Sequence, residues 1–228
     1  MSLKLVTYNI HRAVGSDGRM DPDRIARVEH ELDADVVALQ EVEFGSELPG
    51  ALLSTLSETM NAHVIEGATL RDERGHYGNA VLTRISPTQT QRIDLSAPRR
   101  EPRGAIELDI EVANSRVQII ATHLGLRPAE RRRQIRCLLD RLQDSSADVR
   151  VLLGDLNEWF LWGRPVRWLH RMFDRTPAPP TFPARKPRLA LDRLWVTPGS
   201  ALERVYVHDS DLARITSDHL PLIGELHI

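Results

Sequence analysis

Short apolar runs typical of β-strands recur along the whole chain, and only a few amphipathic helical patterns separate them. Residues 3–10 alternate apolar and polar positions, and residues 35–40 (DVVALQ) form a continuous apolar run that suits a buried strand. Further strands are predicted at residues 80–83, 105–112, 117–122, 149–153, 191–196, 204–207 and 220–228. Many strands with few helices between them predict an α/β or α+β fold in which helices cover β-sheets.

Four helices are predicted between these strands. The first begins at Asp21-Pro22, which supplies an N-cap and a proline at the first helical position, and Ile25, Val28 and Leu32 follow at helical spacing. The other three helical patterns lie at residues 52–60, 135–142 and around 166–173.

No low-complexity linker or repeat interrupts the pattern, so residues 1–228 are predicted to form one domain. Five prolines in residues 176–189 predict an extended, irregular connection rather than a domain boundary. No apolar run approaches the roughly 20 residues that span a bilayer. Because the chain also enters its first strand without a secretory leader, we expect a cytoplasmic protein. A single cysteine, Cys137, excludes an intramolecular disulfide.

Arginine supplies 28 of the 30 basic residues, although the net charge is only −2. The charge is unevenly divided, with −7 in residues 1–114 and +5 in residues 115–228. Guanidinium groups fork onto phosphate oxygens, so this bias favours a phosphate-bearing ligand. An arginine-rich, solvated surface is the simpler interpretation. Nothing here resembles a basic tail or a strongly basic nucleic-acid domain.

Polar side chains gather where the predicted strands end or begin. If the strands share a sandwich, their ends bring carboxylates, amides and imidazoles to one rim. Carboxylate and amide oxygens with two imidazoles and no thiolate predict a Mg²⁺ or Mn²⁺ site, and a phosphoryl substrate would complete such a shell. The residues concerned are Asn9, Glu41, His123, Asp155, Asn157, Asp192, Asp218 and His219.

Seven of these segments, taken in order, resemble the endonuclease/exonuclease/phosphatase superfamily, whose fold is that of deoxyribonuclease I. The chain looks most similar to the short, uncharacterised bacterial members. The resemblance implies a four-layer α/β/β/α sandwich of two mixed β-sheets flanked by helices, and metal-dependent hydrolysis of a phosphate ester. The segments are TYNIH (7–11), LQE (39–41), HYGNAVLTR (76–84), ATHLG (121–125), LLGDLN (152–157), LDRLWV (191–196) and TSDHLPL (216–222).

The resemblance also implies roles around the metal. Glu41 matches the metal-binding glutamate, Asn9 the asparagine that helps to organise metal and phosphate, and Asp218 a carboxylate near the metal. Asp155 and Asn157 match the pair that orients or activates the attacking water.

Two histidines and one aspartate complete the implied machinery. His219 and His123 are expected on the phosphate oxygens or in proton transfer, and Asp192 is expected to hold the tautomer and orientation of His219. The resemblance leaves open whether Asp155 or His219 is the principal general base. A turn residue, a core histidine or a surface ion pair would explain any of these residues singly, but not all of them together at strand ends.

One position departs from the abasic endonucleases, which carry an acidic residue two positions after the first-strand asparagine. His11 stands there, and it argues against a second metal site and against that particular activity. Asn79 is a further candidate that either contacts substrate or caps a turn. The predicted substrate contacts are His11, Asn79, Arg103, Arg127, Trp159 and Trp162.

Three of the four tryptophans, Trp159, Trp162 and Trp168, lie within ten residues of one another after the GDLN segment. We expect Trp159 or Trp162 to form a wall beside the site, where it stacks on bases or enters a lipid interface. Trp168 is expected to pack on the sandwich instead. The arginines at 131–133 and 136 are expected to form a solvated helix face.

These expectations combine into a Mg²⁺-dependent hydrolase of phosphate esters, foremost a phosphodiesterase. A DNA or RNA nuclease, a sphingomyelinase-like phospholipid hydrolase and a small-molecule phosphatase are the alternatives within enzymes. A non-catalytic binding protein on the same fold is the alternative outside them. Nucleic acid and lipid head groups therefore both stay open as partners.

Overall fold

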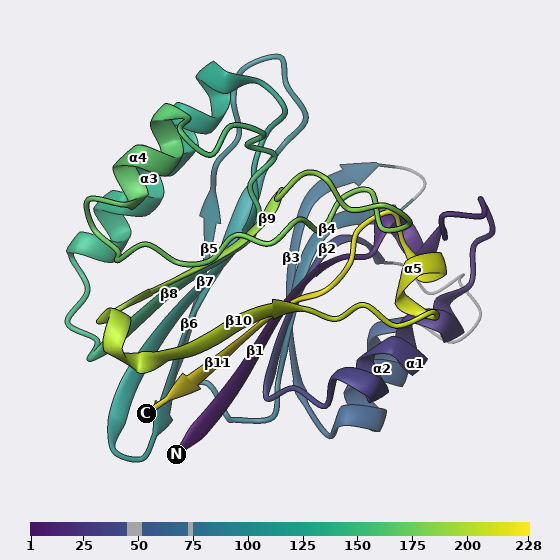
Figure 1. The fold of residues 1–228 in the computed structure, drawn as a ribbon, viewed down its shortest axis with the longest axis horizontal. Helices are drawn as coiled ribbons and strands as arrows, with labels where there is room; N and C mark the ends of the chain where they lie inside the picture. Colours follow the sequence, from purple (N-terminus) through teal and green to yellow (C-terminus); the bar gives the residue numbers. More distant parts are fainter. Residues whose placement is uncertain (45–51, 73–74) are drawn as a thin grey trace.

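The computed structural model describes residues 1–44, 52–72 and 75–228, and in it two β-sheets pack face to face (Figure 1). The strands of the first sheet are β1 (Ser2–Asn9), β2 (Val36–Phe44), β3 (His63–Asp72), β4 (Gly75–Thr83), β10 (Leu202–Val207) and β11 (Leu222–His227). The strands of the second sheet are β5 (Gln89–Asp94), β6 (Gly104–Val112), β7 (Ser115–His123), β8 (Val149–Asp155) and β9 (Asp192–Thr197). Their orders are β10-β11-β1-β2-β4-β3 and β5-β6-β7-β8-β9.

Helices cover the outer face of each sheet. α1 (Pro22–Leu32) and α2 (Leu52–Met60) lie on the first sheet, and α3 (Pro128–Gln143) and α4 (Arg164–Leu169) lie on the second (Figure 1). Buried apolar side chains fill three layers, one under each pair of helices and one between the sheets. The predicted four-layer α/β/β/α sandwich is therefore confirmed.

The central strand β1 is apolar along most of its length because both of its faces are buried. Leu3 and Leu5 point into the layer between the sheets, whereas Val6 and Tyr8 point into the layer under α1. β1 pairs in parallel with β2 and antiparallel with β11, so neither edge nor face meets solvent along most of its length. The apolar residues of β1 pack in the core, and the polar Asn9 is its last residue.

The first helix forms as predicted. The Asp21 carboxylate accepts a hydrogen bond from the Arg24 backbone N–H at 3.3 Å, and Pro22 occupies the first turn, where its missing N–H costs nothing. Ile25 and Val28 are fully buried against the sheet. α4 is shorter than the predicted 166–173, because its last residues continue as turns after Leu169.

Two strands were not predicted, β3 and β5. Both lie at sheet edges, and β5 is exposed along most of its length, so it needs no apolar face. A polar edge strand carries no alternation that a sequence pattern could detect.

Residues 176–189 run as an extended connection, as predicted, with a single bridge between Phe182 and Leu189. This connection carries Thr181 and Phe182 to the polar end of the sandwich. No helix in residues 1–44, 52–72 or 75–228 is long and apolar enough to cross a bilayer.

Candidate active site

Three neighbouring strands of the second sheet carry one titratable residue each at the same edge. His123 at the end of β7 is paired in the ladder with Asp155 at the end of β8, and Asp155 is paired with Asp192 at the start of β9. All three side chains are almost completely buried. Strand register alone therefore sets an imidazole and two carboxylates in a line, which we call the polar row.

A glycine lets this row form. Gly154 has φ +146°, and a Cβ atom there would lie 1.9 Å from the Thr122 carbonyl oxygen on the adjacent strand. Only glycine meets both conditions. Just beyond it, the Asn157 backbone N–H donates to Asp155 Oδ1 at 2.8 Å, which fixes the carboxylate.

The first sheet adds a carboxylate and an amide to the row. Glu41 lies in a β-bulge that interrupts the pairing of β2 with β4, and its φ is +59°. Asn9 Nδ2 lies 3.1 Å from both Glu41 Oε1 and Asp155 Oδ2 and donates to each, while Asn9 Oδ1 accepts from the His11 backbone N–H at 3.0 Å. One amide thus links carboxylates that come from the two sheets.

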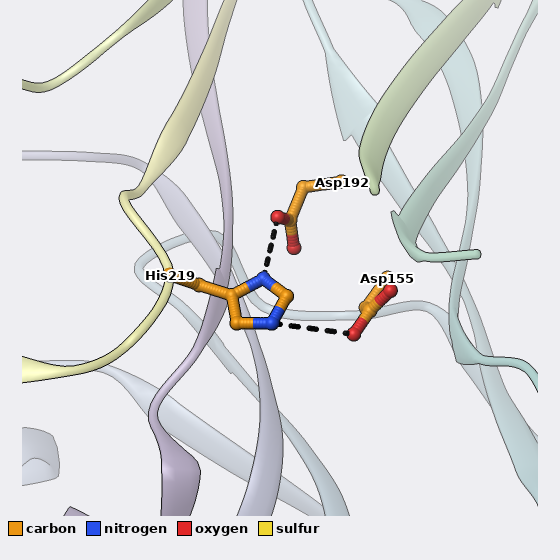
Figure 2. A group of neighbouring side chains, drawn as sticks. All are labelled: Asp155, Asp192 and His219. Atoms are coloured by element: carbon orange, nitrogen blue, oxygen red, sulfur yellow. Dashed lines mark hydrogen bonds and ion pairs between the residues drawn. The ribbon is translucent and has the colours of Figure 1, made fainter. Parts of the chain in front are cut away.

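His219 faces both carboxylates of the row (Figure 2). Its Nδ1 donates to Asp192 Oδ2 at 2.8 Å, and its Nε2 lies 3.9 Å from Asp155 Oδ2. The Thr181 hydroxyl donates to the same Asp192 oxygen at 2.5 Å, and the Phe182 ring packs on the imidazole with 4.9 Å between centroids. The ring is therefore fixed in tautomer and orientation.

Charge decides the protonation of this ring. Burial alone lowers the pKa of His219, but Asp192, Asp155 and Asp218 surround it and together raise the pKa to about 10. His219 is consequently a cation at neutral pH in the protein without bound ligands.

His123 has the opposite character. Burial, reinforced by the nearby Arg103 and His219, lowers the pKa of His123 to about 3 against the attraction of Asp155. The Arg103 guanidinium lies 3.2 Å from Nδ1, and Nε2 lies 3.0 Å from Asn157 Nδ2 and 3.5 Å from Asp155 Oδ2. His123 is therefore buried between Asp155, Asn157 and Arg103, and its expected role on the phosphate oxygens or in proton transfer stays a prediction.

The Ser217-Asp218-His219 segment is tied to the end of β1. Ser217 Oγ donates to the Asn9 carbonyl oxygen at 2.7 Å and accepts from the His219 backbone N–H at 3.3 Å. Asp218 is half-buried, and its Oδ1 lies 3.8 Å from His11 Nδ1. Asp218 and His11 thus share the solvent side of the site.

The remaining predicted substrate contacts separate in space. Asn79 is buried in β4 and donates to the Gly104 carbonyl oxygen on β6 at 3.0 Å, so it joins the two sheets. Arg127 is exposed at the start of α3, and Trp159 and Trp162 are exposed after β8. Trp168 lies on α4 and packs, half-buried, against the apolar layer under α3 and α4, as predicted.

The expected solvated face of residues 131–133 and 136 is wrong for Arg131. Its side chain is only 5% exposed and forms an ion pair at 3.2 Å with Glu158, which is equally buried. The same guanidinium donates to the carbonyl oxygens of Gly125 and Leu126. An arginine run on an amphipathic helix gives no sign that one member turns inward.

Several residues around the site escaped the sequence analysis. Burial, the charge of Glu41 and a hydrogen bond to that carboxylate raise the pKa of Tyr77, which places the phenol beside the proposed metal ligand. Thr181, Phe182 and Ser217 also belong to the site. Tyr77 and Ser217 lie inside segments that resemble the family, whereas only the structure brings the proline-rich connection to His219.

The donor set suits a hard divalent cation. Ligand atoms of Asp155, Asp192 and His219 all lie within 4.8 Å of one another, and Glu41 joins them through Asn9. Asp192 Oδ1 is buried and has no hydrogen-bond partner among the described residues. A site whose ligand atoms are mainly carboxylate and amide oxygens suits Mg²⁺ or Mn²⁺.

Two mixed sheets in a helix-covered sandwich, with this row at one end, define a deoxyribonuclease I-like fold. The chain matches the Endonuclease/Exonuclease/phosphatase family over residues 6–219, and it belongs to that family. Members of the family are generally hydrolases that act on phosphate esters.

Individual proteins are similar to this chain over its whole length. The chain is 29% identical over 246 residues to "Uncharacterized protein YbhP" of Escherichia coli, covering 100% of this chain and 97% of the relative. It superposes with a TM-score of 0.81 on an endonuclease/exonuclease/phosphatase from Beutenbergia cavernae, with 26% identity over 100% of this chain and 72% of that one. D. rerio TDP2, crystallised with a single-strand DNA product, shares the fold at a TM-score of 0.75 and 16% identity, covering 100% of this chain and 99% of that one.

Proposed function

We propose that this protein is a phosphodiesterase that depends on a divalent cation, Mg²⁺ or Mn²⁺. The observation that carries the proposal is the surroundings of Asp155 Oδ2, which has Asn9 Nδ2 at 3.1 Å, His123 Nε2 at 3.5 Å and His219 Nε2 at 3.9 Å. A carboxylate held from three sides is preorganised to position a water molecule and to accept its proton. Membership of a family of phosphate-ester hydrolases supports the same conclusion.

Each side chain of the site then has a distinct task. Asp155 and Asn157 hold the attacking water in line with the scissile P–O bond, and Asp155 takes its proton. His219 donates an N–H to a nonbridging phosphate oxygen, and Asp192 keeps the ring turned toward it. His123 lies 3.5 Å from Asp155 Oδ2 and 3.0 Å from Asn157 Nδ2, so it supports the pair that holds the water.

Glu41, Asp218 and Asp155 are the side chains that would hold the cation, with Asn9 spacing the carboxylates. When bound, a divalent cation neutralises the negative charge of the phosphate. Tyr77 keeps Glu41 oriented through its hydroxyl. The half-buried Asp218 leaves this side of the site open to solvent, where a substrate phosphate can enter.

A substrate panel tests the proposal. Protein freed of metal with a chelator is supplied with Mg²⁺ or Mn²⁺ and offered bis-p-nitrophenyl phosphate, p-nitrophenyl phosphate, sugar phosphates, phospholipids and DNA or RNA oligonucleotides. We expect metal-dependent cleavage, faster for the diester than for the monoester. Single-stranded DNA is included because of the TDP2 neighbour. Folded protein that binds a phosphate analogue but cleaves nothing with either ion would be a binding protein, and the proposal would be wrong.

A further inference from the structure

An exposed apolar surface lies beside the polar row. Five large apolar side chains form it, and we call it the apolar tip. They are five of the eight exposed large hydrophobic residues in the described part of the chain. The members are Leu126, Trp159, Phe160, Leu161 and Trp162, exposed by 68%, 61%, 53%, 55% and 70%.

The tip is built from the two loops that leave the polar row. Leu126 comes three residues after His123, and the aromatic run begins two residues after Asn157. Arg131 fastens the two loops together, since its guanidinium bonds the Leu126 carbonyl oxygen at 2.6 Å and the Glu158 carboxylate at 3.2 Å. The tip is therefore placed by the same strand ends as the site.

Hydrogen bonds to the buried Glu158 and within the backbone fix the loop that carries residues 159–162. Glu158 Oε1 accepts from the Phe160 backbone N–H at 3.2 Å, and the Gly163 N–H donates to the Phe160 carbonyl oxygen at 3.0 Å. A Cβ atom at Gly163 would lie 2.7 Å from the Glu158 carboxyl carbon, so the turn closes tightly over this buried group. A buried ion pair therefore fixes the apolar residues in solvent instead of letting them fold onto the core.

Unpaired positive charge accompanies the tip. Arg127 precedes α3, and Arg164 and Arg167 lie on α4 directly after the aromatic run. All three are exposed, and none forms an ion pair with any residue that the structure describes. Exposed apolar side chains next to arginines without ion-pair partners suit binding to an anionic lipid surface.

The composition of the tip favours lipid over nucleic acid. Leu126 and Leu161 have no π face on which a base could stack. The Phe160 and Trp162 rings contact each other at 5.5 Å with a tilt of 45°, so no base fits between them. Tryptophan with leucine and arginine is instead typical of the boundary between head groups and acyl chains.

We propose that the apolar tip docks this protein on bilayers that contain anionic phospholipids. The docked orientation turns the adjacent polar row toward the lipid head groups. If the protein docks in this way, its substrates are phospholipids, and this second step rests on the proposed phosphoesterase function. The docking itself does not depend on that function.

Vesicle binding tests the docking without turnover. The full chain, in chelator, is sedimented with vesicles of phosphatidylcholine alone or with phosphatidylglycerol added, and tryptophan emission is recorded. Leu161→Asp places a charge within the run of residues 159–162, and Met20→Asp is the matched control, because Met20 is an exposed apolar residue outside the tip. We expect binding to the anionic vesicles with a blue shift, weakened at least about tenfold by Leu161→Asp and unchanged by Met20→Asp.

Other outcomes overturn the proposal. Wild-type protein that stays in solution, or Leu161→Asp that binds as well as wild type, removes the docking surface. Binding of oligothymidylate instead of vesicles would make the tip a base-stacking surface. Hydrolysis of bis-p-nitrophenyl phosphate by the same proteins, assayed separately with Mg²⁺ or Mn²⁺, separates the two proposals, because Leu161→Asp should retain it. Vesicle binding without hydrolysis contradicts only the proposed function, and hydrolysis without vesicle binding contradicts only the docking.

Discussion

Asp155→Asn is expected to lower kcat for bis-p-nitrophenyl phosphate at least about 10³-fold, with either Mg²⁺ or Mn²⁺ present. The substitution keeps the shape of the side chain and the acceptor for the Asn157 N–H, which lies 2.8 Å from Oδ1. It removes the charge that faces Asn9, His123 and His219. The amide cannot take a proton from water, so the loss should fall on kcat.

Asp140→Asn is the matched control, because Asp140 is an exposed carboxylate on α3. It should change neither kcat nor KM. Circular dichroism and thermal unfolding of Asp155→Asn show whether the fold persists. A folded Asp155→Asn protein with a rate within tenfold of wild type would contradict the role assigned to this carboxylate.

Asp192→Asn is expected to lower kcat by about 10²–10⁴-fold although Asp192 does not touch the substrate. The carboxylate orients His219 through the 2.8 Å bond to Nδ1 and is the largest charge that raises the pKa of that ring. The variant should therefore also lower the pKa of His219, measured by NMR titration in chelator. A merely structural residue would not move that titration.

The same linkage sets the pH dependence of stability. The folded-state pKa of His219 is raised from 6.5 to about 10, so the stabilisation from its carboxylate partners is complete below about pH 6.5 and is lost as the pH rises toward 10. The loss of unfolding free energy in Asp192→Asn should accordingly be larger near pH 6 than near pH 10. Thr181→Val, which removes the other donor to Asp192 but keeps its charge, should leave the His219 pKa high. An unchanged His219 titration in Asp192→Asn would contradict this account.

The sequence was most informative where local chemistry and burial coincide. β1 and β7 are buried on both faces, so their apolar runs could be read directly, and Asp21-Pro22 marked the start of α1. The edge strand β5 left no such signal, because solvent accepts its polar side chains, and the other edge strand, β3, was also missed.

The site residues likewise divide into those that a sequence pattern could predict and those that it could not. Residues at strand ends, such as His123 and Asp155, could be predicted to meet because register aligns them. Thr181 could not, since it reaches Asp192 from an irregular connection whose path no pattern specifies. The inward turn of Arg131 and the contact of Arg103 with His123 depend on packing between elements distant in sequence.

Calorimetric titration of Mn²⁺ or Mg²⁺ into wild-type protein and Glu41→Gln tests the central claim most directly. The account places Glu41 from the first sheet and Asp155 from the second on the same Asn9 amide, 3.1 Å from each. It predicts saturable binding to wild type, weakened at least about tenfold in Glu41→Gln and unchanged in the exposed control Glu203→Gln. No saturable binding to wild type, or equal affinity in Glu41→Gln, would show that the two sheets do not share a cation site.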